Sequence, residues 1–231
     1  MTEQEWLTSN DPIRLMDWLR TKPLPLKDVD RRFRLFACAV ARRVWPKLED
    51  DSCLKAIEVA EQHCDGVATS EELQLVWTAV FRFAENATGR TKRRAQAISC
   101  CAEPANAIYH IEHLARDATY IAVHSLFGSV QPEERAAQAS LLKDVLGNPF
   151  RPLAIEPAIL TWRDGAVKKL AEACYWEDRE LPSGHLHKER LAICADAVEE
   201  SGGPEELLVH LRGPVTHVRG CFAIDLLRDR A

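Results

Sequence analysis

The sequence predicts an all-α protein of roughly nine or ten helices, arranged as a helical bundle or array with no significant sheet. Apolar residues recur at i, i+3, i+4 and i+7 in one segment after another, as in amphipathic helices. These segments begin at capping residues and end at glycine or proline. No stretch alternates polar and apolar residues between turn signals, so no strand is expected.

The helices of the N-terminal half have recognisable ends. Asp11 is the expected N-cap of the first helix, and Pro12 occupies its first helical position. Pro46 should end or kink the second helix, and Thr69 with Glu72 has the spacing of a capping box. The predicted ranges, in chain order, are 11–20, 31–48, 50–66, 69–87, 104–127 and 131–148.

A proline-rich connector follows at 148–157, where Pro149, Pro152 and Pro157 exclude a continuous helix. We expect Phe150 to be largely buried and to anchor this connector. The chain is predicted to be a single helical domain over 1–231, or two subdomains, 1–147 and 158–231, joined by the connector. Helices are predicted beyond it at 157–176, 189–201, 204–211 and 216–227, the last capped by Thr216.

Composition indicates an ordinary globular protein, with 46% apolar and 28% charged residues. The net charge of −5 provides no general attraction to nucleic acid or anionic lipid. The eight cysteines form no C-x-x-C pair, and no signal peptide or membrane-length apolar run is visible. We therefore expect a cytoplasmic protein with free thiols and no membrane association.

The C-terminal stretch 210–227 concentrates residues that can bind metals. His217, Cys221 and Asp225 are four apart and would form one row on a helix. His210, His217 and Cys221 could supply three zinc ligands, with Asp225, His185, His187 or Cys194 as outside candidates, or Cys221 and a histidine could form a Cys–His nucleophile. We favour a third interpretation, in which no metal binds and a buried polar seam of His217, Asp225 and Arg151 fixes the last helix.

That preference has two reasons. A Gly213-Pro214 break separates His210 from the other candidate ligands, so the chain would have to bend back to bring them together. A carboxylate such as Asp225 in a mostly apolar helix needs a cation, which an arginine supplies.

A second group of candidate metal ligands lies on the predicted helix 104–127. His110, His113 and Asp117 share a face with His124, and His113 and Asp117 are one turn apart. A solvated face rich in histidine explains the same pattern, and we favour it.

Basic residues gather on the predicted helix 31–48. Arg31, Arg32, Arg42 and Arg43 would form a basic patch suited to nucleic acid. No helix-turn-helix glycine, zinc finger or stacking aromatic accompanies them, so an ion-paired surface is the preferred interpretation.

The motifs "EWL", "RLFACA", "GNPFRP", "HLRGP" and "HVRGC", followed by "DLL", together resemble a large paralogous family of bacterial proteins without an established activity. The resemblance covers residues 5–67 and 138–227. Relatives often have Cys and Trp where this chain has Leu211 and Phe222. The resemblance implies no catalytic residues, and the change at Leu211 removes a thiolate that a metal site could use.

Hydrolase and nucleotide-binding motifs are absent from the sequence, so no catalytic residue is assigned. We predict a non-catalytic helical protein-interaction or adaptor module whose partner is another protein, with no cofactor. The first alternative is a metal-dependent protein that binds zinc through one of the two histidine clusters. The second is nucleic-acid binding through the arginine-rich helix.

Overall fold

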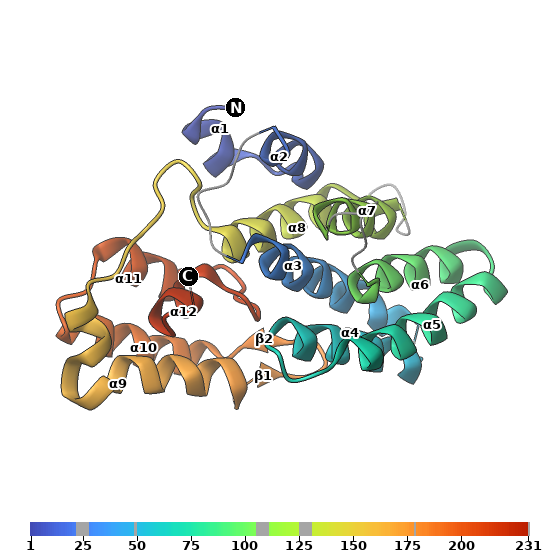
Figure 1. The fold of residues 1–231 in the computed structure, drawn as a ribbon. Coiled ribbons are helices and arrows are strands. Elements are labelled where there is room, and N and C mark those ends of the chain that lie inside the picture. Colours follow the sequence, from blue (N-terminus) through green and yellow to red (C-terminus); the bar gives the residue numbers. More distant parts are fainter. Residues whose placement is uncertain (22–27, 49, 105–110, 125–130, 178, 231) are drawn as a thin grey trace. The chain divides into compact units, whose positions relative to one another are not determined.

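The computed structural model describes residues 1–21, 28–48, 50–104, 111–124, 131–177 and 179–230 (Figure 1). It is 73% helical, which confirms the all-α prediction. The described residues form twelve α-helices, a short 3₁₀ helix and one two-stranded sheet. They divide into two compact units, the first made of Met1–Leu24 and Asp28–Leu142 and the second containing Lys143–Ala231. The division falls inside a helix, before the connector 148–157.

The first unit is built from helices that pack around α3. This helix contacts α4, α6 and α7, and α5 packs against α4 and α6. The elements are α1 (Glu3–Thr8), α2 (Pro12–Leu19), α3 (Val29–Val44), η1 (Trp45–Lys47), α4 (Asp51–Cys64), α5 (Ser70–Asn86), α6 (Gly89–Ala102), α7 (Ile111–His124) and α8 (Gln131–Leu146), whose last turn belongs to the second unit.

Local signals place several of these helix ends. Asp11 caps α2 by accepting a hydrogen bond from the amide of Ile13. Thr69 caps α5 by accepting one from the amide of Glu72, and the Glu72 carboxylate accepts one from the amide of Thr69; both caps are as predicted. The sequence does not predict α1 and α6. Helix α1 has only six residues. Helix α6 begins with a basic turn, and its buried apolar residues, such as Ala95 and Ile98, lie only in its second half.

The second unit has its own apolar core. Its elements after α8 are α9 (Pro157–Trp176), β1 (Arg179–Glu180), β2 (His185–Leu186), α10 (Lys188–Glu200), α11 (Glu205–Leu211) and α12 (Phe222–Leu227). Helix α9 packs against α10 and α12, and α10 packs against α11. The backbone of α9 leaves the helical conformation from Trp162 to Gly165, which divides it into two helical segments. Fully buried members of the core include Val167, Tyr175, Leu207 and Ile224.

The prediction for Phe150 is wrong, because 37% of this residue is exposed. A turn at the start of the connector directs it outward: Asn148 Oδ1 accepts a hydrogen bond from the amide of Phe150 at 3.0 Å. Leu153 and Ile155 pack against the core of the second unit instead. The connector is therefore anchored by its later apolar residues.

The last helix is shorter than predicted, since α12 begins at Phe222 and not near Thr216. Gly220 has φ +88°, a left-handed conformation that ends any helix there. Val218 instead forms a β-bridge with His185, so residues 212–221 run as a loop beside β2. His217, Cys221 and Asp225 therefore do not form one row on a helix.

Within the described part of the chain, no helix combines the length and the apolar character needed to cross a bilayer.

Candidate metal centre

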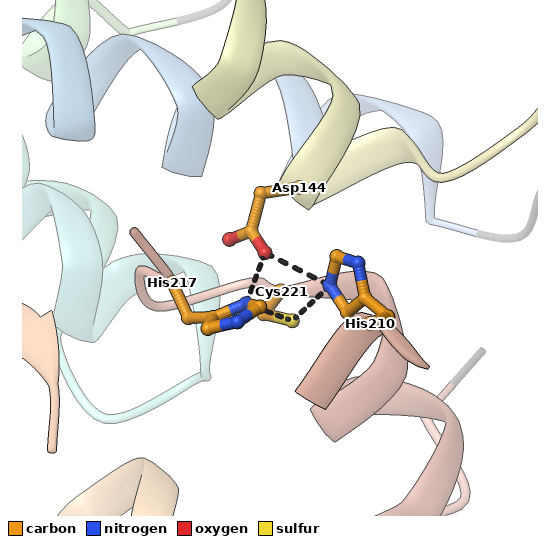
Figure 2. A group of neighbouring side chains, drawn as sticks. All are labelled: Asp144, His210, His217 and Cys221. Carbon is orange, nitrogen blue, oxygen red and sulfur yellow. Dashed lines mark hydrogen bonds and ion pairs between the residues drawn. The ribbon is translucent and has the colours of Figure 1, made fainter. Parts of the chain in front are cut away.

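Four side chains of the second unit converge in its interior: Asp144, His210, His217 and Cys221 (Figure 2). One ligand atom from each lies within 4.8 Å of all the others. Asp144 and Cys221 are fully buried, 2% of the His217 side chain is exposed, and the His210 side chain retains 17% exposure. Carboxylate, imidazole and thiolate are the groups that zinc prefers.

Asp144 is fixed by the last turn of α8 and by the loop that faces it. Its Oδ2 accepts a hydrogen bond from the amide of Val218 at 3.0 Å. This bond leaves Oδ1 directed at the two histidines. His217 is held through its own carbonyl, which accepts a hydrogen bond from the amide of Leu186 in β2 at 2.9 Å. Two backbone contacts therefore orient two of the four side chains.

His210 reaches the cluster because the chain turns sharply after α11. The amide of Gly213 bonds to the carbonyl of His210 at 3.1 Å, and a Cβ at Gly213 would lie 3.0 Å from the carbonyl oxygen of Val209. The loop then passes back beside α11, so that the His210 and His217 rings meet edge to face at 4.6 Å. The Gly213-Pro214 break therefore brings the ligands together, contrary to the expectation that it keeps them apart.

In each histidine of the cluster, one ring nitrogen lies close to both the Asp144 carboxylate and the Cys221 sulfur. Nδ1 of His217 lies 2.7 Å from Oδ1 of Asp144 and 3.6 Å from the sulfur of Cys221. Nε2 of His210 lies 3.1 Å from the same oxygen and 3.3 Å from the same sulfur. Each histidine thus presents a single nitrogen to both an oxygen and a sulfur.

The charge states of the two acidic groups differ. Burial by itself would raise the pKa of Asp144, but hydrogen bonds from His210 and His217 outweigh it and lower this pKa to about 2. Burial, together with the nearby Asp144 carboxylate, raises the pKa of the Cys221 thiol well above its usual range. Without a cation the cluster therefore contains a carboxylate and a neutral thiol.

Sequence reasoning identifies His210, His217 and Cys221 and misses Asp144. The signal that could have found it is weak: Asp144 stands among Leu141, Leu142, Val145 and Leu146, directly before the "GNPFRP" motif, but Lys143 is next to it. A carboxylate buried at the end of a helix needs a partner. The local pattern does not predict which residue that partner is, because the partner His210 lies more than sixty positions away in the chain.

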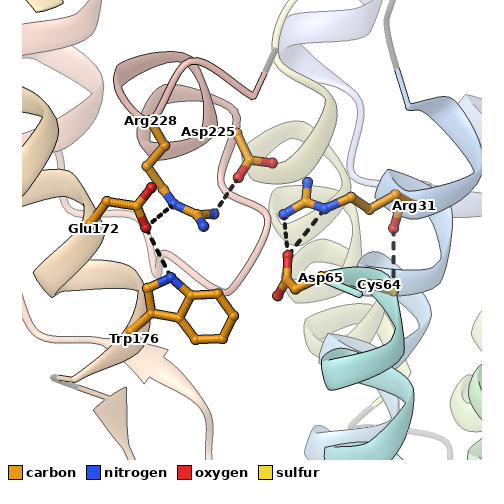
Figure 3. Close-up of polar contacts among 7 residues, drawn as sticks. All are labelled: Arg31, Cys64, Asp65, Glu172, Trp176, Asp225 and Arg228. Carbon is orange, nitrogen blue, oxygen red and sulfur yellow. Dashed lines mark hydrogen bonds and ion pairs between the residues drawn. The ribbon is translucent and has the colours of Figure 1, made fainter. Parts of the chain in front are cut away.

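The predicted polar seam is only partly reproduced. Asp225 is fully buried and accepts a hydrogen bond from Arg228 at 3.2 Å, which confirms that it pairs with an arginine (Figure 3). Arg228 also bonds to Glu172 at 3.0 Å. His217 lies in the metal-ligand cluster, and Arg151 lies on the exposed surface of the connector.

The second histidine group has few described members. His110 lies outside the described residues, and nothing is described of the His124 side chain. His113 is half-buried and Asp117 is exposed on α7. The described residues of this group supply no convergent ligand set.

The four arginines of the predicted basic patch are directed into the first unit. Arg31 bonds to Asp65 at 2.9 Å (Figure 3), Arg42 to Glu61 at 2.6 Å and Arg43 to Glu134 at 2.8 Å. Arg32 is 3% exposed. Carboxylates occupy three of the four guanidinium groups that a phosphate backbone would need, and the fourth arginine is buried, so these residues form no open arginine stripe.

Comparisons with protein-family models, curated proteins and solved structures gave no match. The resemblance based on short motifs therefore stays a prediction, and function must be argued from the site itself.

Proposed function

We propose that the second unit binds a divalent transition metal, Zn²⁺ in the first instance, through Asp144, His210, His217 and Cys221. The observation that supports the proposal is the convergence of these four ligand atoms, three of them on buried residues, within 4.8 Å. The proposal departs from the expectation of no cofactor, because that expectation depended on His210 lying apart from the other ligands.

Each ring nitrogen can direct a proton to only one of its two neighbours at a time. A proton on Nδ1 of His217 can point to Asp144 or to Cys221, and the same holds for Nε2 of His210. If either nitrogen is unprotonated, its lone pair faces the lone pairs of the carboxylate. A cation at the centre accepts a lone pair from all four atoms at once.

Two of the ligand separations also fit. Zinc bonds of about 2.0 Å to oxygen and nitrogen and about 2.3 Å to sulfur give ligand–ligand separations of roughly 3.3–3.6 Å in a tetrahedron. The separations between His210 and Cys221 and between His217 and Cys221 are 3.3 and 3.6 Å. The edge between Asp144 and His217, at 2.7 Å, would widen by roughly 0.6 Å to reach the tetrahedral range.

Charge balance supports a divalent ion. A carboxylate and a thiolate with two neutral imidazoles carry two negative charges, which M²⁺ cancels, so no net charge is left in a buried site. The thiolate and imidazoles favour zinc or cobalt over magnesium or calcium, which prefer oxygen ligands.

The metal is proposed to be structural. Four protein ligands complete a tetrahedral shell, whereas catalytic zinc sites keep a position for water or substrate. The ligands come from the end of α8, the end of α11 and the loop before α12, so one ion joins three segments of the second unit. A non-catalytic helical module with a protein partner remains the corresponding proposal for the whole chain.

The test is metal content and cobalt substitution in protein purified without a histidine tag. We expect one zinc per chain and, after exchange, a cobalt spectrum with intense tetrahedral d–d bands and a thiolate-to-cobalt band. Cys221→Ser should abolish the thiolate band. Cys100→Ser, the same change at a half-buried thiol of the first unit, should leave it intact.

Protein that contains no stoichiometric metal as purified, and takes up neither zinc nor cobalt after reconstitution, would overturn the proposal.

A further inference from the structure

Gly147, the first residue of the "GNPFRP" motif, lies beside the group formed by Asp144, His210, His217 and Cys221, because it packs against Phe222. Gly147 is buried, comes three positions after Asp144 and has φ +72°. A Cβ built on Gly147 would lie 3.0–3.3 Å from three ring carbons of Phe222. Only glycine lets the Phe222 ring pack this closely against the chain here.

Phe222 also packs against the proposed ligand His210. Its ring centroid lies 4.4 Å from that of His210, with an angle of 50° between the planes. The His210 ring touches His217 at 4.6 Å as well. Two ring contacts therefore restrict the orientation of His210, whose Nε2 then points at Asp144 and Cys221.

We infer that Gly147 and Phe222 are positioning residues for the metal ligand His210. This inference rests on the proposed metal-binding function. Phe222 directly follows the ligand Cys221, and Gly147 ends the helix that carries the ligand Asp144, so each belongs to a segment that the metal would bind. The absence of a Cβ at Gly147 leaves space that the Phe222 ring fills, and this ring in turn fixes the orientation of the His210 ring.

A side chain at Gly147 should act on the metal through this contact. The ring of Phe222 would have to move by a few tenths of an ångström, and His210 would lose its orientation. Outer-shell changes of this kind lower metal affinity by about 10–100-fold. Backbone strain alone, from a positive φ, would lower stability without a specific effect on the metal spectrum.

The chain offers a matched control. Gly202, after α10, has φ +78°, and a Cβ there would meet nothing within 4 Å. Gly147→Ala and Gly202→Ala therefore share the backbone cost and differ in the contact with Phe222. We expect Gly147→Ala to bind Co²⁺ about tenfold more weakly than Gly202→Ala, in competition with a chelator, and to show shifted d–d bands.

A second variant tests the same contact from the other side. Phe222→Leu should weaken Co²⁺ binding by itself, because a smaller side chain no longer fills the space against the His210 ring. It should also reduce the further loss caused by Gly147→Ala, since the clash is partly removed. The Co²⁺ affinity of the single variant Phe222→Leu tests the contact even if the single variant Gly147→Ala does not fold.

The outcomes separate the two proposals. If wild-type protein binds Co²⁺ and Gly147→Ala matches Gly202→Ala in affinity and spectrum, the positioning role is overturned and the metal site stands. The positioning role is overturned in the same way if Phe222→Leu leaves both affinity and spectrum at wild-type values. If wild-type protein binds no Co²⁺, both proposals fall.

Discussion

The buried Glu61 of the first unit and the buried Asp144 of the second unit have different partners. In the first unit, Arg42 and Glu61 form a paired contact at 2.6 and 2.9 Å, with side chains 2% and 3% exposed. In the second unit, the buried Asp144 faces two imidazoles and a thiol. The guanidinium group brings a permanent charge and a separate N–H for each carboxylate oxygen, whereas the imidazoles share single nitrogens among several contacts.

This difference indicates which of the two carboxylates we propose to need a cation from outside the chain. The Arg42–Glu61 pair is complete, because positive and negative charges cancel and each oxygen has a donor. Asp144 also has a donor for each oxygen, the Val218 amide and the two imidazoles, but among the described residues it forms no ion pair with an arginine or lysine. We propose that a metal ion supplies the positive charge there. A buried carboxylate therefore points to a metal only when its neighbours are themselves metal ligands.

The largest effect is expected from breaking the complete pair. Arg42→Met leaves Glu61 buried without its cation and should lower the free energy of unfolding by about 3–5 kcal/mol. Urea unfolding followed by circular dichroism measures this loss. Added zinc should not restore it, because the first unit is proposed to hold its charge without an ion.

The double variant Arg42→Met with Glu61→Leu is the control, and most of the stability should return, since both charges are gone. A loss in Arg42→Met that zinc reverses would contradict the distinction between the two units.

A smaller loss of stability is expected from Asp225→Ala, which tests a buried carboxylate of the second unit that, unlike Asp144, has an arginine partner. Its partner Arg228 also bonds to Glu172 and lies 3.5 Å from the Tyr175 ring. Asp225→Ala should therefore cost about 1.5–3 kcal/mol, the range for a hydrogen bond to a charged group, because Arg228 keeps a carboxylate. Tryptophan fluorescence during urea unfolding measures the loss, since Trp176 bonds to the same Glu172 (Figure 3).

Asp196→Ala in α10 provides the comparison for this variant, because that side chain is 65% exposed and its loss should change stability by less than about 1 kcal/mol. Equal effects of the two substitutions would show that the buried contact between Asp225 and Arg228 contributes nothing.

Most of the fold could be predicted from local patterns. Apolar stripes and capping residues such as Asp11 and Thr69 lie within one or two turns of the structure they determine. Phe150 shows the limit: a large apolar residue in a connector can face either way, and the Asn148 turn decided its direction.

The site was harder to predict, since its geometry depends on contacts between distant segments. The spacing of His217 and Cys221 suggests one helix, but Gly220 and the bridge from Val218 to His185 make this segment a loop. Asp144 completes the cluster from a helix that carries no local metal pattern. Residue types identified three of the four proposed ligands, and only the tertiary fold supplied the fourth.

X-ray absorption at the zinc edge, on tag-free protein loaded with one equivalent of zinc, tests the central claim most directly. It reports the atoms bound to the metal and their distances. The four proposed ligands, Asp144, His210, His217 and Cys221, predict one sulfur at about 2.3 Å and three nitrogen or oxygen atoms at about 2.0 Å. The sulfur should be lost in Cys221→Ser and kept in Cys100→Ser. A shell of five or six oxygen and nitrogen atoms without sulfur would contradict the claim.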